Sequence, residues 1–337
     1  MKLLVTGGAG FIGSNFIDYW LVKYPRDQVI NLDLMTYCAN PLTVKYHKEK
    51  FKSYKFVKGD ICDEEIVKRL VRKVDIIVHF AAESHVDRSI TMPHQFIRTN
   101  VLGTHILLDM AKEAGKKRFH HVSTDEVFGT LKLNSKKKFD ERTCYDPRSP
   151  YSASKAASDH LVRAYFETYK LPITITNCSN NYGPFQFPEK VIPLYITRAM
   201  YDKLLPIYGE GKAVRDYLYV KDHCEAIDLV IEEGKIGETY CIGGDSERST
   251  VEVAYTILDA LSKSDDLIRH TVDRPGHDPR YAIDHTKITA ELGWEPKYNF
   301  KEGIEATIEW YKNNEDWWRP ISKKAEEIAE KYLSKTK

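Results

Sequence analysis

A glycine-rich segment between an apolar strand and a helix constrains the fold of this chain more than any other feature. The apolar run KLLVT predicts a buried β-strand, and the segment SNFIDYWLVKY that follows the glycines has helical periodicity. The linking segment TGGAGFIG contains two glycine patterns. Gly8, Gly10 and Gly13 give G-x-G-x-x-G, whereas Gly7, Gly10 and Gly13 give G-x-x-G-x-x-G. A strand, a glycine turn and a helix in this order are typical of a dinucleotide-binding unit.

An acidic residue at the end of the next strand indicates which dinucleotide is bound. The strand QVINLD ends at Asp33, twenty residues beyond Gly13. A carboxylate in this place accepts hydrogen bonds from the adenosine ribose and repels a 2′-phosphate, which favours NAD over NADP. The pyrophosphate would lie at the helix N-terminus, where the glycines allow close approach. The alternative is a tight turn without a ligand, and the combination of strand, glycines, helix and acid argues against it.

Strands and helices alternate through the first half of the chain. The near-continuous apolar runs in YKFVKGD, VDIIVHFAA, RFHHVST and PITITNCSN predict buried parallel strands, and helical segments separate them. This pattern predicts an α/β fold with a doubly wound, Rossmann-like parallel sheet. After about Asn181 the chain becomes richer in proline, glycine and aromatic residues. We therefore expect an NAD-binding domain at 1–184 and a smaller, partly interleaved α/β substrate lobe at 185–337, with part of 217–244 returning to the first domain.

The composition excludes several function classes. The 337 residues include 50 Lys+Arg and 49 Asp+Glu, so the net charge of +1 argues against a nucleic-acid surface or an acidic partner as the main function. No apolar run is long enough to span a membrane. The six cysteines form no CxxC pair and have no zinc-site spacing, so we expect reduced thiols, no metal site and a cytoplasmic protein.

The segment PYSASK places Tyr151 and Lys155 four residues apart, on one face of a predicted helix. An unperturbed tyrosine is a poor base at neutral pH, but a nearby ammonium group and the positive nicotinamide would both favour its phenolate. Such a phenolate can take a hydroxyl proton while hydride leaves for NAD⁺. The alternative is an exposed helical pair, and the dinucleotide pattern upstream favours the catalytic interpretation.

Three polar residues, Thr124, Asp125 and Glu126, follow the apolar run RFHHV in the segment STDEVFG. Polar groups at the end of a buried strand are unfavourable unless they have partners. One interpretation is a turn with a helix cap or a salt bridge. Another is that the two carboxyl groups act as acid and base, because different environments can push their pKa values apart.

Several motifs resemble the extended short-chain dehydrogenase/reductase family. The glycine loop, FAAESHVDRS, STDE, YSASK and NCSNNYGP occur in the order of that family and span nearly the whole chain. Within the family, AAESHVDRSI, CSNNYGPFQFPEK, VRDYLYV and DRPGHDPRYAID are most similar to the nucleotide-sugar 4,6-dehydratases that act on dTDP-glucose. The resemblance implies an NAD-dependent hydro-lyase that forms dTDP-4-keto-6-deoxyglucose, as used in deoxysugar biosynthesis.

The resemblance also implies the roles of the catalytic residues. Tyr151, supported by Lys155, takes the proton of the 4-hydroxyl as C4 is oxidised, and Thr124 holds the new ketone in place. Glu126 removes the C5 proton, which the ketone has acidified. Asp125 protonates the C6 hydroxyl as water leaves, and hydride then returns to C6. Related epimerases share the Tyr–Lys pair but usually carry small or hydroxylated residues in place of the two acids.

Two sets of binding residues follow from the same resemblance. The NAD set is Gly7, Gly10, Phe11, Ile12, Gly13, Asp33, Thr36, Asp60, Ile61, Ala81, Ala82, Thr99, Tyr151, Lys155 and Asn181. The nucleotide-sugar set is Ser84, Thr124, Asn180, Lys190, Val191, Pro206, Ile207, Tyr208, Arg215, Thr250, Asp273, Arg274 and His277. Lys190, Arg215 and Arg274 would neutralise the diphosphate, and Tyr208 offers an aromatic face to the base. Thr250 stands where the family has an asparagine that contacts the diphosphate.

Alternative functions remain open at this stage. The same 4,6-dehydration could act on UDP-glucose or UDP-N-acetylglucosamine, because relatives with those substrates share most of these motifs. An NAD-dependent 4-epimerase and a non-catalytic NAD-binding regulator are further alternatives, although a regulator would typically have lost Tyr151, Lys155 or the acid pair. Family relatives are commonly homodimers, so we expect a homodimer that binds neither nucleic acid nor membranes.

Overall fold

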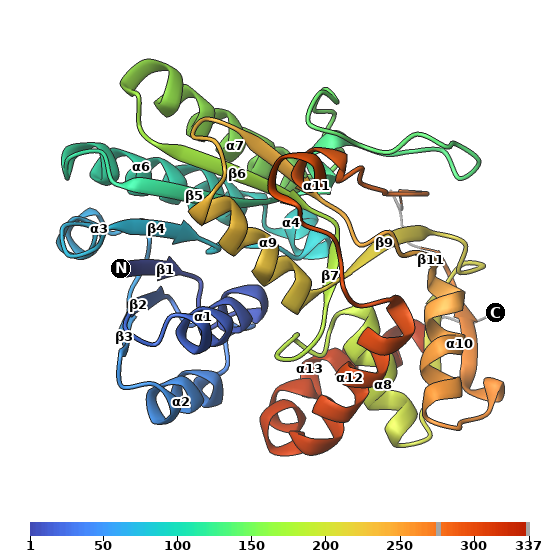
Figure 1. Ribbon diagram of the computed structural model, residues 1–337. Coiled ribbons are helices and arrows are strands. Elements are labelled where there is room, and N and C mark those ends of the chain that lie inside the picture. Colours follow the sequence, from blue (N-terminus) through green and yellow to red (C-terminus); the bar gives the residue numbers. More distant parts are fainter. Residues whose placement is uncertain (274–277, 335–337) are drawn as a thin grey trace.

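The alternating apolar and amphipathic segments form a parallel sheet with helices on both faces (Figure 1). The computed structural model describes residues 1–273 and 278–334. Within this part of the chain the main sheet has seven parallel strands. In spatial order they are β3 (Tyr54–Lys58), β2 (Gln28–Asp33), β1 (Lys2–Thr6), β4 (Ile76–His79), β5 (Arg118–Thr124), β6 (Ile173–Cys178) and β10 (Thr239–Ile242). The predicted doubly wound α/β fold is confirmed, and its strand order reverses between β1 and β4, where such sheets bind ligands.

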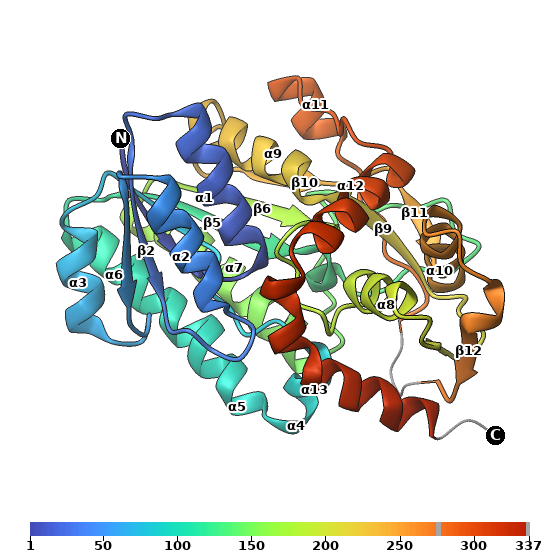
Figure 2. The same ribbon diagram turned by 90° about the horizontal axis from the view of Figure 1, so that it is seen from below.

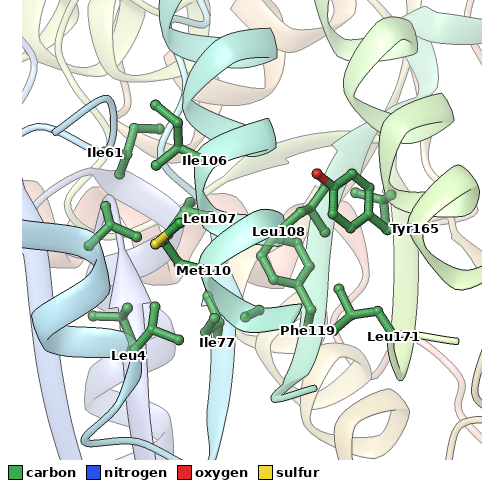
Figure 3. Packing of buried hydrophobic residues seen from close by; sticks show 14 of the residues in the cluster. Leu4, Ile61, Ile77, Ile106, Leu107, Leu108, Met110, Phe119, Tyr165 and Leu171 are labelled. Atoms are coloured by element: carbon green, nitrogen blue, oxygen red, sulfur yellow. The ribbon is translucent and has the colours of Figure 1, made fainter. Parts of the chain in front are cut away.

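Each face of the main sheet is covered by a separate group of helices. One face packs against α3 (Glu64–Val71), α6 (Thr104–Glu113) and α7 (Pro150–Tyr169). Figure 3 shows this packing, in which Leu107 and Leu108 of α6 lie among Ile77, Phe119 and Leu171. The opposite face packs against α1 (Phe11–Lys23) and α9 (Val220–Glu232), and α2 (Pro41–Lys50) lies beside β3. Both faces are therefore buried, which explains why central strands such as β1 and β4 carry near-continuous apolar runs.

The helical segment NVLGTHILLDMAKEA, which precedes β5, does not begin as an α-helix. The chain passes through α4 (Val86–Thr91) and α5 (Pro93–Phe96) into a π-helical segment, η1 (Ile97–Gly103), and only then into α6. The buried Asn100 lies in this segment, and its carbonyl accepts hydrogen bonds from Ser158 Oγ (2.6 Å) and Thr104 Oγ1 (2.5 Å). These side-chain donors bond a carbonyl within the helix, an arrangement that accompanies local distortion of helices.

A smaller lobe lies beside the carboxyl ends of β5 and β6 (Figures 1 and 2). Its core combines tyrosine, tryptophan and isoleucine side chains from two short sheets and four helices. The short strands are β7 (Asn180–Tyr182), β9 (Val214–Tyr219) and β11 (Glu247–Ser249) in one sheet, and β8 (Leu205–Tyr208) and β12 (Ile268–Thr271) in the other. The helices are α8 (Val191–Met200), α10 (Thr250–Ala260), α12 (Phe300–Asn313) and α13 (Glu315–Leu333). The remaining short elements are η2 (Asp125–Phe128), which follows β5, and η3 (Asp265–Leu267) and α11 (Thr286–Leu292).

The chain crosses between the lobe and the main sheet more than once. It leaves the sheet after β6, forms β7, α8, β8 and β9 in the lobe, and then returns through α9 to β10 at the edge of the sheet. The division into domains at residue 184 remains a prediction. Within the described residues, no helix is both long and apolar enough to cross a membrane.

Candidate active site

A cavity of about 310 Å³ opens at the carboxyl ends of β1, β2, β4 and β5, where the strand order reverses. Every residue of the predicted NAD set lines it, from Gly7 of the glycine loop to Asn181 of β7. All five predicted catalytic residues line it as well. The structure therefore brings the glycine loop, which ends at Gly13, together with Thr124, Asp125 and Glu126, which lie more than a hundred positions later in the sequence.

The glycine loop is packed so closely that two of its glycines leave no room for a side chain. Gly7 has a φ of 73°, and a Cβ atom there would lie 2.6 Å from the backbone nitrogen of Ala81. A Cβ atom at Gly13 would lie 2.5 Å from the carbonyl oxygen of Gly7. Helix α1 then begins after Gly10, which has no side chain to cap the helix N-terminus. The loop is therefore closely packed against the neighbouring backbone on one side and lines the cavity on the other, as binding of a pyrophosphate requires.

Asp33 connects the glycine loop to the segment that follows β2. Its side chain is buried, and its two oxygens accept hydrogen bonds from the backbone N–H groups of Ala9 (2.9 Å) and Met35 (2.8 Å). Burial raises the pKa of Asp33, although these two hydrogen bonds act in the opposite direction. The carboxylate is thus held at the cavity wall where the ribose is expected.

Asp60 lines the other side of the predicted adenosine site. Its oxygens accept hydrogen bonds from Cys62 N–H (2.8 Å) and from the Arg98 guanidinium (2.8 Å). Burial opposes ionisation, but these two donors outweigh it and lower the pKa of Asp60. The sequence analysis did not anticipate Arg98, which lies 38 positions away on η1.

The segment 34–40, which we refer to as the lid, follows β2, and five of its residues line the cavity. Tyr37 connects the lid to the opposite wall. The Tyr37 hydroxyl donates a hydrogen bond to Glu189 Oε1 at 2.8 Å. The Arg88 guanidinium lies 3.8 Å from the centre of the Tyr37 ring, and the ring of Phe187 meets it edge-on at 5.7 Å. Met35 in the lid has a positive φ of 60°. The lid is thereby fixed to α4 and to the loop before α8.

Tyr151 and Lys155 occupy the first turns of α7, as predicted. A capping box between Ser149 and Ser152 and a proline at the first helical position start this helix at the cavity wall. Tyr151 is buried, which raises the pKa of its phenol. Lys155 Nζ is also buried and donates a hydrogen bond to the carbonyl oxygen of Val122 at 2.8 Å. Burial lowers the pKa of Lys155.

The end of β5 carries Thr124, Asp125 and Glu126 into the same cavity. The amide of Asn177 holds this strand end by donating a hydrogen bond to the Thr124 carbonyl at 3.1 Å. Asp125 is fully buried, and burial together with the neighbouring Glu126 raises its pKa well above the usual range. The raised pKa favours the protonated form of Asp125, which suits it to donate a proton, as the sequence analysis expected of one of the two acids.

The predicted nucleotide-sugar residues are placed in two groups. Ser84, Thr124, Asn180 and Lys190 line the cavity. The other described residues lie outside its lining, on the lobe: Val191 on α8, Pro206, Ile207 and Tyr208 on β8, Arg215 on β9, Thr250 at the start of α10, and Asp273 after β12. Arg274 and His277 lie outside the described residues.

Arg215 and Thr250 have partners within the lobe. The Arg215 guanidinium lies 4.2 Å from the centre of the Tyr281 ring, and its positive charge acts to lower the pKa of Asp125. It is therefore close enough to the cavity to influence the acid pair. The Thr250 hydroxyl donates to the carbonyl oxygen of Ala213 at 3.4 Å.

Several buried polar atoms of the cavity wall are available to a ligand. Among the described residues, Asp125 Oδ2, Ser179 Oγ, Asn180 Oδ1 and Gln186 Oε1 have no hydrogen-bond partner. Such atoms are unfavourable unless a bound molecule or water satisfies them. Together with the open glycine loop and Asp33, they fit a dinucleotide and a polyhydroxylated substrate. The sequence analysis missed Ser179 and Gln186, although both stand in the motif CSNNYGPFQFPEK.

Comparisons with known proteins agree with this geometry. The model of the GDP-mannose 4,6 dehydratase family matches residues 4–307. The dTDP-glucose 4,6-dehydratase of Escherichia coli is 49% identical over 95% of this chain and 96% of that protein. A dTDP-glucose 4,6-dehydratase of Xanthomonas campestris is 51% identical over 93% of this chain and 94% of that protein. The solved structure of the Streptomyces venezuelae dTDP-glucose 4,6-dehydratase, with NAD and a TDP ligand bound, has a TM-score of 0.91 at 46% identity and covers 95% of this chain and 100% of that chain.

Proposed function

This chain belongs to the GDP-mannose 4,6 dehydratase family of extended short-chain dehydrogenase/reductases, and we propose that it converts dTDP-glucose to dTDP-4-keto-6-deoxyglucose. It is an NAD-dependent hydro-lyase. The observation that supports this most strongly is the meeting of Thr124, Asp125 and Glu126 with Tyr151 and Lys155 in one cavity. Oxidation of a hydroxyl by NAD⁺ needs only the tyrosine and lysine from the protein, whereas elimination of water needs an additional acid and an additional base.

The NAD-binding residues would hold the cofactor along the glycine loop, with Asp33 at the ribose and Asp60 at the adenine. When bound, NAD accepts hydride from C4 of the sugar and returns it to C6. The lid limits exchange of the cofactor with solvent, which this chemistry requires because the same cofactor molecule is oxidised and reduced within one turnover.

The protein's own groups move the protons of the reaction. Tyr151 takes the proton of the 4-hydroxyl, and the Lys155 ammonium stabilises its phenolate. Thr124 hydrogen-bonds the ketone oxygen at C4. Glu126 removes the C5 proton, Asp125 gives its proton to the departing 6-hydroxyl, and one molecule of water is lost. A proton then returns to C5. Asp125 suits the acid role because its pKa is raised.

Lys190 and Arg215 would bind the diphosphate of the substrate. Lys190 lines the cavity, and Arg215 lies on β9 near the acid pair. Their positive charges match two phosphate groups, and an arginine can bind one of them in a bidentate manner. Tyr208 lies on β8, within the lobe that would bind the nucleotide base.

A substrate screen tests the proposed function. The purified protein is incubated separately with dTDP-glucose, UDP-glucose and UDP-N-acetylglucosamine, and the products are identified by mass spectrometry and nuclear magnetic resonance. We expect a 4-keto-6-deoxy product from dTDP-glucose at a kcat/KM well above that of either UDP-sugar. A 4-keto-6-deoxy product from a UDP-sugar alone would contradict dTDP-glucose as the substrate but would support 4,6-dehydration as the reaction. Isomerisation without water loss would contradict the chemistry.

We propose in addition that the protein is a homodimer and acts in the cytoplasm. Two large apolar side chains of η1, Ile97 and Leu102, are 53% and 45% exposed beside α7, and a second copy of the chain would cover them. The six cysteines carry free thiols, which fits a reducing compartment. Sedimentation of the wild-type protein and of an Ile97→Asp, Leu102→Asp variant tests the dimer, because only the variant should sediment as a monomer.

A further inference from the structure

Asp159 extends the face of α7 that carries the two residues expected to act on the 4-hydroxyl. It lies one helical turn beyond Lys155 and two turns beyond Tyr151, so the three side chains share one face. Its carboxyl group is completely buried. One oxygen, Oδ2, accepts three hydrogen bonds, from Ser123 Oγ (2.9 Å), Tyr145 OH (2.8 Å) and Asn177 Nδ2 (3.2 Å). A buried carboxylate with this many donors is well suited to remain ionised.

The Lys155 ammonium needs a compensating charge because it is buried. Its Nζ atom lies 3.4 Å from His121 Nε2, and His121 Nε2 in turn lies 3.1 Å from Asp159 Oδ1. Within the described part of the chain no carboxylate contacts this ammonium directly. The imidazole edge of His121 therefore stands between the cation and the carboxylate of Asp159.

The remaining groups around Lys155 contribute no second charge. Burial, aided by the Lys155 ammonium, lowers the pKa of His121 to about 4, so this ring is neutral at physiological pH. Burial also lowers the pKa of His79 on β4 and raises the pKa of Cys178 on β6, so both are neutral. Burial opposes ionisation of Asp159, but His121, Lys155 and Ser123 outweigh it and hold its pKa below the usual range. The buried set therefore contains one cation and one anion.

Asp159 also joins the two elements that carry the reacting groups. Ser123, which donates to Asp159, immediately precedes Thr124 on β5. Asn177 donates both to Asp159 and to the carbonyl oxygen of Thr124, at 3.2 and 3.1 Å. The same carboxylate therefore lies next to the end of β5 and on the helix that carries Tyr151.

We propose that Asp159 is a positioning residue for the reaction, whose buried carboxylate balances the charge of Lys155 and holds the end of β5 against α7. The inference rests on the proposed function, because it assigns Asp159 a part in sustaining the Tyr151–Lys155 pair. Without the carboxylate, the ammonium would lose its proton at a lower pH, since burial already disfavours the charged form. A neutral amine would no longer stabilise the Tyr151 phenolate.

The first test compares Asp159→Asn with Tyr145→Phe. Asparagine removes the charge with little change of shape, whereas Tyr145→Phe removes one hydrogen bond to the same carboxylate and leaves its charge in place. The readout is the pH dependence of the rate at which the NAD-loaded enzyme reduces its cofactor after mixing with dTDP-glucose. In Asp159→Asn the alkaline limb should move to lower pH by about one to two pH units, the effect of one lost charge at close range. Tyr145→Phe should keep the wild-type profile, and Asp159→Glu should restore part of it.

A second readout needs no substrate. The free energy of unfolding of each variant relative to wild type is measured in urea at pH 7 and pH 9. A lysine whose pKa is lowered in the folded state makes stability rise with pH as it loses its proton. The loss of unfolding free energy caused by Asp159→Asn should therefore be smaller at pH 9 than at pH 7. The loss caused by Tyr145→Phe should be the same at both pH values. If Asp159→Asn does not fold, Asp159→Glu should show a smaller effect in the same direction.

The outcomes separate this inference from the proposed function. A wild-type enzyme that does not reduce its NAD with dTDP-glucose contradicts the proposed function, and the unfolding measurements then decide the inference alone. An unchanged pH profile and a constant stability deficit in Asp159→Asn would overturn the charge-balancing role. Equal shifts in Asp159→Asn and Tyr145→Phe would also overturn it, because they would reduce Asp159 to a structural residue.

Discussion

Replacing Tyr37 with phenylalanine should release NAD faster from the holoenzyme without changing the fold. The Tyr37 hydroxyl attaches the lid to Glu189 by a hydrogen bond of 2.8 Å. Phenylalanine retains the ring that lies 3.8 Å from the Arg88 guanidinium and meets Phe187 edge-on. The substitution therefore removes one hydrogen bond and leaves the aromatic contacts in place.

The size of the effect follows from the partner of that hydrogen bond. A hydrogen bond to a charged group stabilises a structure by about 1.5–3 kcal/mol. If this bond must break when the lid opens, its loss should accelerate NAD release roughly 10- to 150-fold, at about 1.4 kcal/mol for each factor of ten. Tyr37→Ala also removes the contacts with Arg88 and Phe187 and should accelerate release further.

The assay loads each protein with NAD, removes the free cofactor and follows dissociation into an excess of a competing dinucleotide. Tyr46→Phe is a matched control, because its hydroxyl donates to Asp18 at 2.9 Å on the exposed side of α2, outside the cavity lining. We expect wild-type release from this control. Release from Tyr37→Phe at the wild-type rate, or equal acceleration in both variants, would refute the role of the lid hydrogen bond.

Three further perturbations test the base, the acid and one buried histidine. Glu126→Gln should slow C5 proton exchange and water loss by about 10²- to 10⁴-fold while still allowing NAD reduction, as deuterium uptake and cofactor absorbance would show; unchanged turnover would contradict its role as base. Asp125→Asn should slow water loss by a similar factor while C5 exchange continues. In the wild type the raised pKa of Asp125 keeps its proton available, so the rate of water loss should fall only as the pH rises and Asp125 is deprotonated. His47 is buried among aromatic rings with a pKa lowered to about 4, so its neutral form stabilises the fold above about pH 6.5, and this contribution falls by about 1.4 kcal/mol per pH unit as the pH drops toward 4. His47→Phe should reduce the slope of the unfolding free energy, measured in urea, against pH between pH 6.5 and 4. An unchanged slope would contradict this role of His47.

The local parts of the site could be predicted from the sequence because neighbouring residues determine them. The glycine loop, Asp33 and the Tyr151–Lys155 pair each depend on spacing within one strand–turn–helix unit or one helix, and the structure places all of them at one cavity. The same holds for Thr124, Asp125 and Glu126, which follow directly from the end of β5.

The remaining features depend on contacts between distant segments, which spacing does not reveal. Tyr37 and Glu189 are 152 positions apart, and the hydrogen bond between them requires the lid and the lobe to be placed first. The π-helical start of the helix after Phe96 coincides with hydrogen bonds from side chains of α6 and α7 to the carbonyl of Asn100, and the one from Ser158 comes from a distant segment. The substrate residues on the lobe lie outside the cavity lining for a related reason, since their position depends on how β8 and β9 pack beside the main sheet.

The most direct test of the proposed chemistry follows a label from C4 of the sugar. dTDP-glucose carrying deuterium at C4 is converted in ordinary water, and a second sample of unlabelled substrate is converted in heavy water. We expect the C4 label to appear at C6 of a 4-keto-6-deoxy product and solvent deuterium to appear at C5. Return of the label to C4 with no loss of water, as an epimerase would give, or loss of the label to free cofactor, would contradict a 4,6-dehydratase that retains its NAD.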